Sequence, residues 1–153
     1  MFDIILGLAA ASASCVPAES RPEDLAQINA TSSAIRSAFA ERDVEGIARY
    51  HHDNVIKSLG PGQYYEGKKA LKAQLSETFG SVALKFGEGG QRNREALMIC
   101  GESAISITLF EIAFIPDDGS EGGVFAGRTM VVMVRSKDAP HGWVVFSELI
   151  QPQ

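Results

Sequence analysis

Two different hydrophobic patterns divide the chain, and this division constrains its fold more than any other feature. Near the start, largely apolar residues recur every three or four positions from Leu25 to Phe39, which predicts a helix over residues 22–41. The second half is instead rich in β-branched and aromatic residues, which favour strands. The predicted strands cover residues 83–86, 94–100, 103–115, 123–135 and 143–150. Helices that precede a run of antiparallel strands predict an α+β fold, with the helices packed on one face of a curved antiparallel sheet.

Shorter elements lie between these regions. Asp43 can cap a second helix over residues 44–51, and the apolar stripe of residues 68–79 predicts a third helix. Residues 54–59 are typical of a short strand, which ends at Gly60 and the Pro-Gly pair after it. No internal repeat or linker divides residues 19–153, so a single domain over this range is expected.

The N-terminus has features of an export signal. Residues 4–13 form an apolar run that is too short to span a bilayer but suits the hydrophobic region of a secretory signal. Small residues suited to a cleavage site come next, at Ala11-Ser12-Ala13 and at Val16-Pro17-Ala18, although the usual basic residues at the start are missing. We expect a leader over residues 1–18 and export to the periplasm or the extracellular space. If the leader is not a signal, the protein stays in the cytoplasm.

The two cysteines have different expected roles. The stretch from Ser12 to Cys15 resembles a bacterial lipobox, in which Cys15 would carry a lipid anchor. If the leader leaves with or before Cys15, Cys100 has no disulfide partner. Cys100 lies in an apolar stretch without a neighbouring base, so we expect a small buried side chain there rather than a nucleophile.

Charge and composition exclude several classes of partner. The 153 residues include 14 Lys and Arg against 19 Asp and Glu, a net charge of −5, and the basic residues form no cluster. A nucleic-acid partner is not expected, because phosphate binding needs basic patches. No run of about 20 apolar residues could span a membrane. The sequence lacks a His-X₃-His spacing and a His/Cys cluster, so neither a metal site nor a cofactor is predicted.

Three stretches of the sequence carry a resemblance to a known family. They are Ala38–Ile47, then Tyr50–Val55 with Tyr65–Leu71, and finally Gly127–Val132 with Gly142–Val145. In order and spacing, these stretches resemble the SnoaL-like family, which belongs to the superfamily of nuclear transport factor 2 and ketosteroid isomerase. The resemblance covers residues 20–151.

The resemblance implies a cystatin-like cone, in which a strongly bent sheet wraps around three helices and a pocket opens at one end. It also implies a homodimer formed through the sheet. Members include isomerases, dehydratases, cyclases and non-catalytic binding or assembly modules, so the fold alone assigns no chemistry. The carboxylate base of ketosteroid isomerases would fall near Ser58 or Leu59, and their tyrosine near Ile35 or Arg36, so neither residue is matched.

Polar groups at positions expected to face the interior are the candidates for chemistry, because burying such groups is costly. His51 completes the stripe of the second predicted helix and would point into the cone as a general acid or base. Alternatively, His51 is a core residue bonded to the backbone. Tyr50 would orient a ligand or pack in the core. Tyr64 and Tyr65 lie where family members place pocket-lid residues, and Tyr65 is predicted to contact the ligand.

Three charged residues interrupt apolar strand faces, namely Glu111, Arg128 and Glu148. In a functional interpretation, they form a pocket with His51 in which a carboxylate of raised pKa moves a proton. In a structural interpretation, an Arg–Glu pair crosses the sheet or lies at a dimer interface. A bulge in any of these strands would change the face on which its charged residue lies.

The sequence therefore predicts an exported SnoaL-like protein that binds a small apolar molecule and could catalyse proton transfer of the isomerase, dehydratase or cyclase type. The predicted catalytic residues are His51, Glu111 and Glu148, and the predicted ligand-binding residues are Tyr50, Tyr65 and Arg128. The alternative function is a non-catalytic homodimeric module for ligand binding or assembly.

Overall fold

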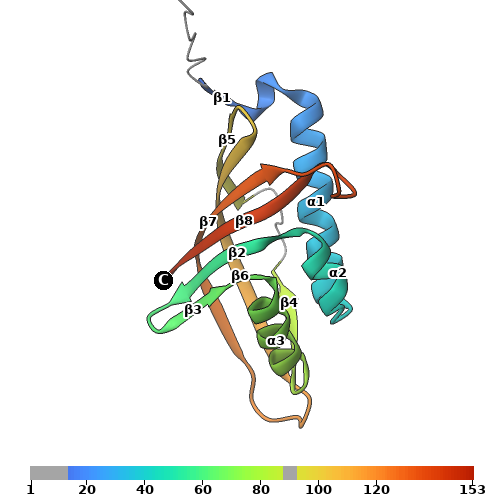
Figure 1. Ribbon diagram of the computed structural model, residues 1–153. Helices are drawn as coiled ribbons and strands as arrows, with labels where there is room; N and C mark the ends of the chain where they lie inside the picture. Colours follow the sequence, from blue (N-terminus) through green and yellow to red (C-terminus); the bar gives the residue numbers. More distant parts are fainter. Residues whose placement is uncertain (1–13, 88–92) are drawn as a thin grey trace, which may run out of the picture.

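The computed structural model describes residues 14–87 and 93–153 and has the predicted α+β architecture. The helices are α1 (Pro22–Ala40), α2 (Val44–Arg49) and α3 (Lys68–Phe79), preceded by the 3-10 turn η1 (Ala18–Ser20). The strands are β1 (Cys15–Pro17), β2 (His51–Gly60), β3 (Gln63–Glu66), β4 (Val82–Phe86), β5 (Arg94–Cys100), β6 (Ser103–Pro116), β7 (Gly123–Arg135) and β8 (Trp143–Pro152). The helices lie on one side of a strongly curved sheet, which confirms the cone (Figure 1).

The sheet has the strand order β1-β5-β6-β7-β8-β2-β3, with β4 paired to β6 beside this path. All of these pairs are antiparallel except β2 and β8, which run parallel. The expectation of a purely antiparallel sheet is therefore wrong at this pair. The long connection through β3, α3 and the other strands brings the C-terminal β8 alongside β2 in the same direction.

The second helix is shorter than predicted, and this changes the position of His51. Asp43 caps α2 as expected, because its Oδ1 accepts a hydrogen bond of 2.8 Å from the Gly46 backbone N–H. The helix ends at Arg49, so His51 is the first residue of β2 rather than the last residue of a helical stripe. The strand β3 was not predicted; it comes after the turn that Gly60 and Gly62, both at positive φ, form at the end of β2.

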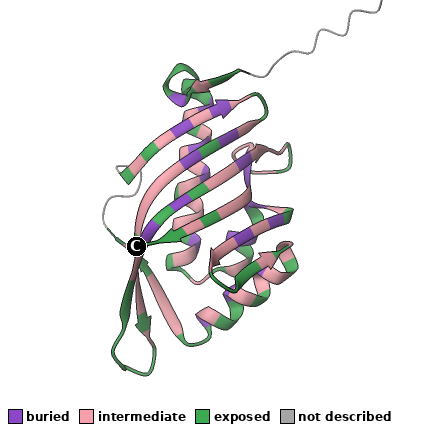
Figure 2. Cartoon of the chain, turned by 90° about the vertical axis from the view of Figure 1, so that its left-hand side faces the viewer, coloured by how far each residue is buried: buried purple, intermediate pink, exposed green. Residues whose placement is uncertain are grey.

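The core lies between the concave face of the sheet and the helices. Its most completely buried large side chains include Ile28 of α1, Leu71 of α3, Ile99 of β5 and Trp143 of β8, each at most 1% exposed. Buried and exposed residues alternate along the central strands, with the helices behind the sheet (Figure 2). This alternation is expected where the two faces of a sheet have different environments. It lets us assign each strand residue to the concave or the convex face.

The N-terminal cysteine packs on the domain. Cys15 of β1 lies directly opposite Cys100 of β5, and the two form a disulfide. While Cys15 is present, the edge strand β1 places it beside Cys100, so the expectation of an unpaired Cys100 applies only to a chain that has lost Cys15. The same bond uses the Cys15 sulfur, the atom to which a lipid anchor would be attached, and the anchor itself stays a prediction. Ala18, at the end of the predicted leader, is 0% exposed.

Candidate functional site

A cavity of about 920 Å³ lies between the concave face of the sheet and helices α1 and α3. Its wall is largely apolar and aromatic, with Phe39, Phe86, Phe114 and Phe125 among the lining residues. Its polar side chains are His51, Lys57, Glu148, Arg36, Arg94, Ser32, Ser81, Ser106, Thr108, Gln63, Gln74, Thr78, Tyr65 and Glu77. Apolar walls with a limited set of polar groups are typical of small-molecule sites.

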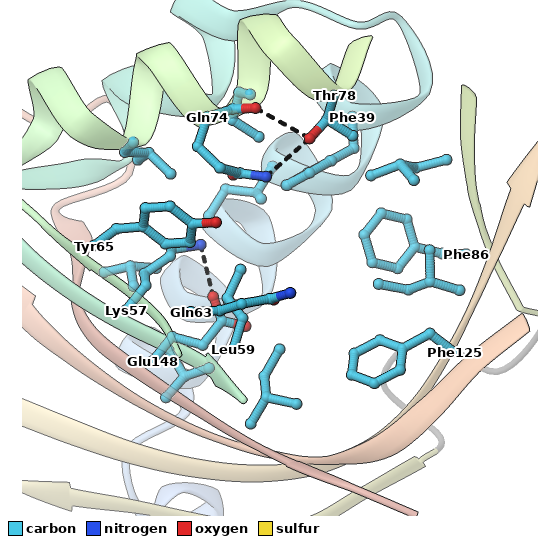
Figure 3. A pocket seen from close by; sticks show the side chains of 18 of the residues that line it. Phe39, Lys57, Leu59, Gln63, Tyr65, Gln74, Thr78, Phe86, Phe125 and Glu148 are labelled. Atoms are coloured by element: carbon cyan, nitrogen blue, oxygen red, sulfur yellow. Dashed lines mark hydrogen bonds and ion pairs between the residues drawn. The ribbon is translucent and has the colours of Figure 1, made fainter. Parts of the chain in front are cut away.

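A buried ion pair lies in the wall of the cavity. Lys57 and Glu148 are register partners on the parallel strands β2 and β8, and their Nζ and Oε2 atoms are 2.6 Å apart. Figure 3 shows the pair on one side of the cavity, with Phe86 and Phe125 on the other. The side chains are 8% and 20% exposed, so neither charge is well solvated. Thr129 donates a further hydrogen bond of 3.3 Å to Glu148 Oε1.

The electrostatics of the pair keep Glu148 charged. Burial raises the pKa of Glu148, but the nearby Lys57 ammonium and the Thr129 hydroxyl outweigh it, so the pKa is lowered from its ordinary value. Glu148 is therefore a carboxylate near neutral pH. The prediction of a carboxylate of raised pKa does not hold for this residue, because sequence analysis missed its cationic partner.

His51 lines the same cavity and is 2% exposed. Burial and the Lys57 charge lower the pKa of His51 to about 3, against the smaller opposing effects of a hydrogen bond to Ile47 and of Glu148. The imidazole is therefore neutral at physiological pH. Its Nδ1 lies 2.8 Å from the backbone oxygen of Ile47, which can only accept, so Nδ1 carries the proton. The second nitrogen, Nε2, is left as a hydrogen-bond acceptor.

The structure brings three of the predicted site residues together. His51, Glu148 and Tyr65 all line the cavity. Glu148 reaches it because the pairing of β7 with β8 is irregular after Val145, which puts Val145 and Glu148 on the same face. The neighbouring Tyr64 is 59% exposed and does not line the cavity.

The other three predicted site residues do not line the cavity. Glu111 is exposed, because its neighbour Ile112 takes the concave face of β6. Arg128 is exposed and pairs at 2.6 Å with Glu95, not with either predicted acid. This pair fits the structural interpretation of an Arg–Glu bridge across the sheet.

Tyr50 is the third of these residues. It is 8% exposed and stacks on the ring of His141, with the ring centroids 5.7 Å apart. This agrees with the alternative that Tyr50 packs in the core.

Sequence analysis missed three cationic residues of the cavity, Arg36, Lys57 and Arg94. Lys57 alternates with the apolar Val55 and Leu59 in β2, so the search for charges on apolar strand faces could have found it. Arg94 is the first residue of β5 and its position gave no comparable signal. Within residues 14–87 and 93–153, no three His, Cys, Asp or Glu side chains are grouped as metal ligands, and no helix is long and apolar enough to cross a membrane.

Comparison with known proteins identifies the fold. No protein-family model matches the sequence, and no curated protein does. A conserved protein from Planctomyces limnophilus has 21% sequence identity and a TM-score of 0.74, over 87% of this chain and 100% of that chain. A ketosteroid isomerase-like protein from Erwinia carotovora atroseptica has 17% identity and a TM-score of 0.67, over 85% and 96%. A nuclear transport factor 2-like superfamily protein from Salmonella enterica has 11% identity and a TM-score of 0.69, over 88% and 92%.

This chain has the nuclear transport factor 2-like fold. The fold that the resemblance implied is thereby confirmed, and membership of the superfamily and of its SnoaL-like family stays a prediction. At these identities the likeness gives the fold and not the chemistry. The position expected for the ketosteroid isomerase base was near Ser58 or Leu59. In this nuclear transport factor 2-like cone, Leu59 lines the cavity there, and neither residue has a carboxylate.

Proposed function

We propose that this nuclear transport factor 2-like domain binds a small, largely apolar molecule in its cavity. The observation that carries the proposal is the cavity of about 920 Å³, whose apolar wall contains the buried Lys57–Glu148 pair and the neutral His51. A well-formed apolar pocket with a few convergent polar groups is the usual form of a ligand site. His51 Nε2 would accept a hydrogen bond from the ligand, and Lys57 would donate one.

Titration with uncharged apolar probes tests this proposal. Hexanamide, 2-naphthamide and dodecanamide span a range of sizes, and binding can be measured by calorimetry and by the rise in melting temperature. The variant Leu59→Trp should fill part of the cavity and weaken binding. The variant Tyr64→Trp is the matched control, because it introduces the same side chain on the exposed side of the neighbouring strand. If both variants bind alike, or if the wild-type protein binds neither these amides nor the carboxylates of the same carbon skeletons, the proposal is wrong.

We further propose that the cavity can promote proton transfer next to a carbonyl group of the ligand. In this step a C–H bond breaks, the proton moves to His51 Nε2, and the electron pair moves to the carbonyl oxygen beside Lys57. A base with a pKa of about 3 is weak, so the reaction depends on Lys57 stabilising the oxygen charge and on Glu148 stabilising the imidazolium. The grouping of these three side chains favours this function over passive binding.

Deuterium exchange tests the proton transfer. In D₂O, 2-acetylnaphthalene should incorporate deuterium at its methyl group faster with the protein than without it, as monitored by NMR. The variant His51→Asn retains a donor for the Ile47 carbonyl but has no imidazole base, so exchange should fall to the background rate. If exchange with the wild-type protein equals the background rate while the ketone binds, the protein is a binding module and not this kind of catalyst.

We also propose that two copies pair through the convex face of the sheet, as the family resemblance implies. An apolar row of register partners crosses this face at Ala96, Ile107, Met130 and Leu149, and the last two are 40% and 49% exposed. Adjoining exposed apolar side chains of this kind are a feature of protein–protein contact sites. Light scattering after size exclusion should give a dimer for the wild-type protein and a monomer for Met130→Lys. A monomeric wild-type protein would overturn this proposal.

Export remains a proposal, and the disulfide supports it. Disulfides persist mainly in oxidising compartments such as the periplasm and the extracellular space. Cleavage after Ala13 would keep Cys15 for the bond with Cys100, whereas cleavage after Ala18 would remove it. We therefore expect a mature N-terminus at Ser14, read by mass spectrometry of the exported protein. A protein found reduced in the cytoplasm would contradict export.

A further inference from the structure

The cavity contains a second charged region, formed by Arg36 of α1 and Arg94 of β5. Arg94 Nη1 donates a hydrogen bond of 2.9 Å to Asn29 Oδ1. Its Nε is buried and has no hydrogen-bond partner among the described residues. Among those residues, neither arginine lies within ion-pair distance of an acidic group. A buried guanidinium nitrogen without an acceptor is costly, so its surroundings call for an acceptor.

The two guanidinium groups also affect one another. Burial and the Arg36 charge lower the pKa of Arg94, and the smaller opposing effect of the Glu19 charge offsets this only in part. Because arginine stays protonated in proteins, both groups remain cationic and repel each other. The two acidic residues of the lining do not relieve this, since Glu148 is paired with Lys57 and the exposed Glu77 pairs with neither arginine.

Hydroxyl groups continue this polar region along the floor of the cavity. Thr108 is the register partner of Arg94 on β6, and its Oγ1 lies 3.3 Å from the Oγ of Ser106. Both side chains line the cavity and are able to donate hydrogen bonds to an anion. The surrounding wall is apolar and offers few other groups that could solvate a doubly charged anion. A singly charged, planar carboxylate therefore fits this environment better than a phosphate monoester does.

We propose that Arg36 and Arg94 bind the carboxylate of the ligand, so that the cavity selects apolar molecules that carry one carboxylate group. This inference rests on the proposed ligand-binding function and adds the substrate class. Arg94 lines the cavity, and the planar fork of its guanidinium can donate to both oxygens of a carboxylate. The apolar part of the ligand then lies along the phenylalanine side chains toward Lys57 and His51.

Three matched pairs of probes test this inference. Each pair has the same carbon skeleton and nearly the same shape, with a carboxylate in one member and an amide in the other: hexanoate and hexanamide, 2-naphthoate and 2-naphthamide, dodecanoate and dodecanamide. Charge-assisted hydrogen bonds to the carboxylate should make at least one acid bind about 10-fold to 100-fold more tightly than its amide. Arg94→Met and Arg36→Met should each remove most of this preference, measured as the ratio of acid to amide affinity in the same variant.

The control is Arg49→Met, which makes the same substitution on the exposed side of α2 and should keep the preference. Arg94→Lys covers the case in which Arg94→Met fails to fold, because it keeps a charge but loses the fork and should retain an intermediate preference. If amides and acids bind equally, or if the preference survives both cavity substitutions, the carboxylate site is wrong while the ligand-binding function stands. If no member of any pair binds, both are wrong.

Discussion

The buried His51 should make the protein less stable in mild acid by a predictable amount. In the folded protein the pKa of His51 is lowered to about 3, whereas in the unfolded chain it returns to about 6.5. Below pH 6.5 the unfolded state therefore binds a proton that the folded state does not, and acid favours unfolding. The loss of stability begins near pH 6.5 and levels off near pH 3, which is the range between the two pKa values.

The size of the effect is set by these two pKa values. Between about pH 7.5 and about pH 5, the difference in proton binding at His51 lowers the free energy of unfolding by about 2 kcal/mol. This figure hardly depends on the exact pKa in the folded state, because His51 is already neutral there at pH 5. It depends mainly on the pKa of His51 in the unfolded chain, which is close to that of a free histidine side chain.

Urea unfolding at the two pH values measures this effect, with the fluorescence of Trp143, the chain's single tryptophan, as the signal. The variant His51→Asn can be less stable at both pH values, but its loss between them should be smaller than that of the wild type by about 2 kcal/mol. Other titrating groups are common to both proteins and cancel. His52→Gln is the control, because it removes the neighbouring imidazole and leaves His51 in place. An equal loss in wild type and His51→Asn would refute the reasoning.

Three further perturbations have defined outcomes in the same unfolding assay. Replacing both Cys15 and Cys100 by serine should lower the free energy of unfolding by about 4–5 kcal/mol. The reason is that the disulfide closes a loop with a sequence separation of 85 and restricts the unfolded chain. A change below about 1 kcal/mol would contradict this. Glu148→Leu should lower the free energy of unfolding by about 3–5 kcal/mol, because it leaves Lys57 charged and buried. The double variant with Lys57→Met should recover most of that loss. If it recovers nothing, the two charges are not coupled. Asp43→Ala should cost about 1 kcal/mol by removing the cap of α2, and an unchanged midpoint would argue against that cap.

The long elements could be predicted because each has a hydrophobic period that tertiary contacts do not override. The bounds of α3 agree with the prediction, and those of β5 and β7 do as well. The short β3 and the edge strand β1 could not be predicted, because each is stabilised by a neighbour far away in the sequence. The disulfide depends on that same distant pairing, so cysteine spacing alone could not reveal it.

Of the six site residues predicted from the sequence, three line the cavity and three do not. For the charged strand residues the reason is that both faces of the sheet are apolar. A charge on an apolar strand face is predicted to face the interior, but the convex face of this sheet is apolar too, with Ile105 36% exposed. Glu111 and Arg128 are on that outer face, whereas the irregular pairing in β8 brings Glu148 inward. Lys57 meets the same criterion as Glu148 and was open to prediction. Its pairing with Glu148 was not, because that pairing depends on the parallel contact between β2 and β8.

The polar residues of the cavity favour ligand binding over a purely structural role. An open space of about 920 Å³ forgoes packing contacts, and buried charges such as Lys57 and Arg94 have lost hydration. Apolar side chains of similar volume would often serve stability as well or better. An assembly module that acts through its convex face needs neither the space nor these charges. A ligand that is apolar along its length and carries a carboxylate at one end accounts for both, since it fills the space and brings a negative charge to Arg36 and Arg94.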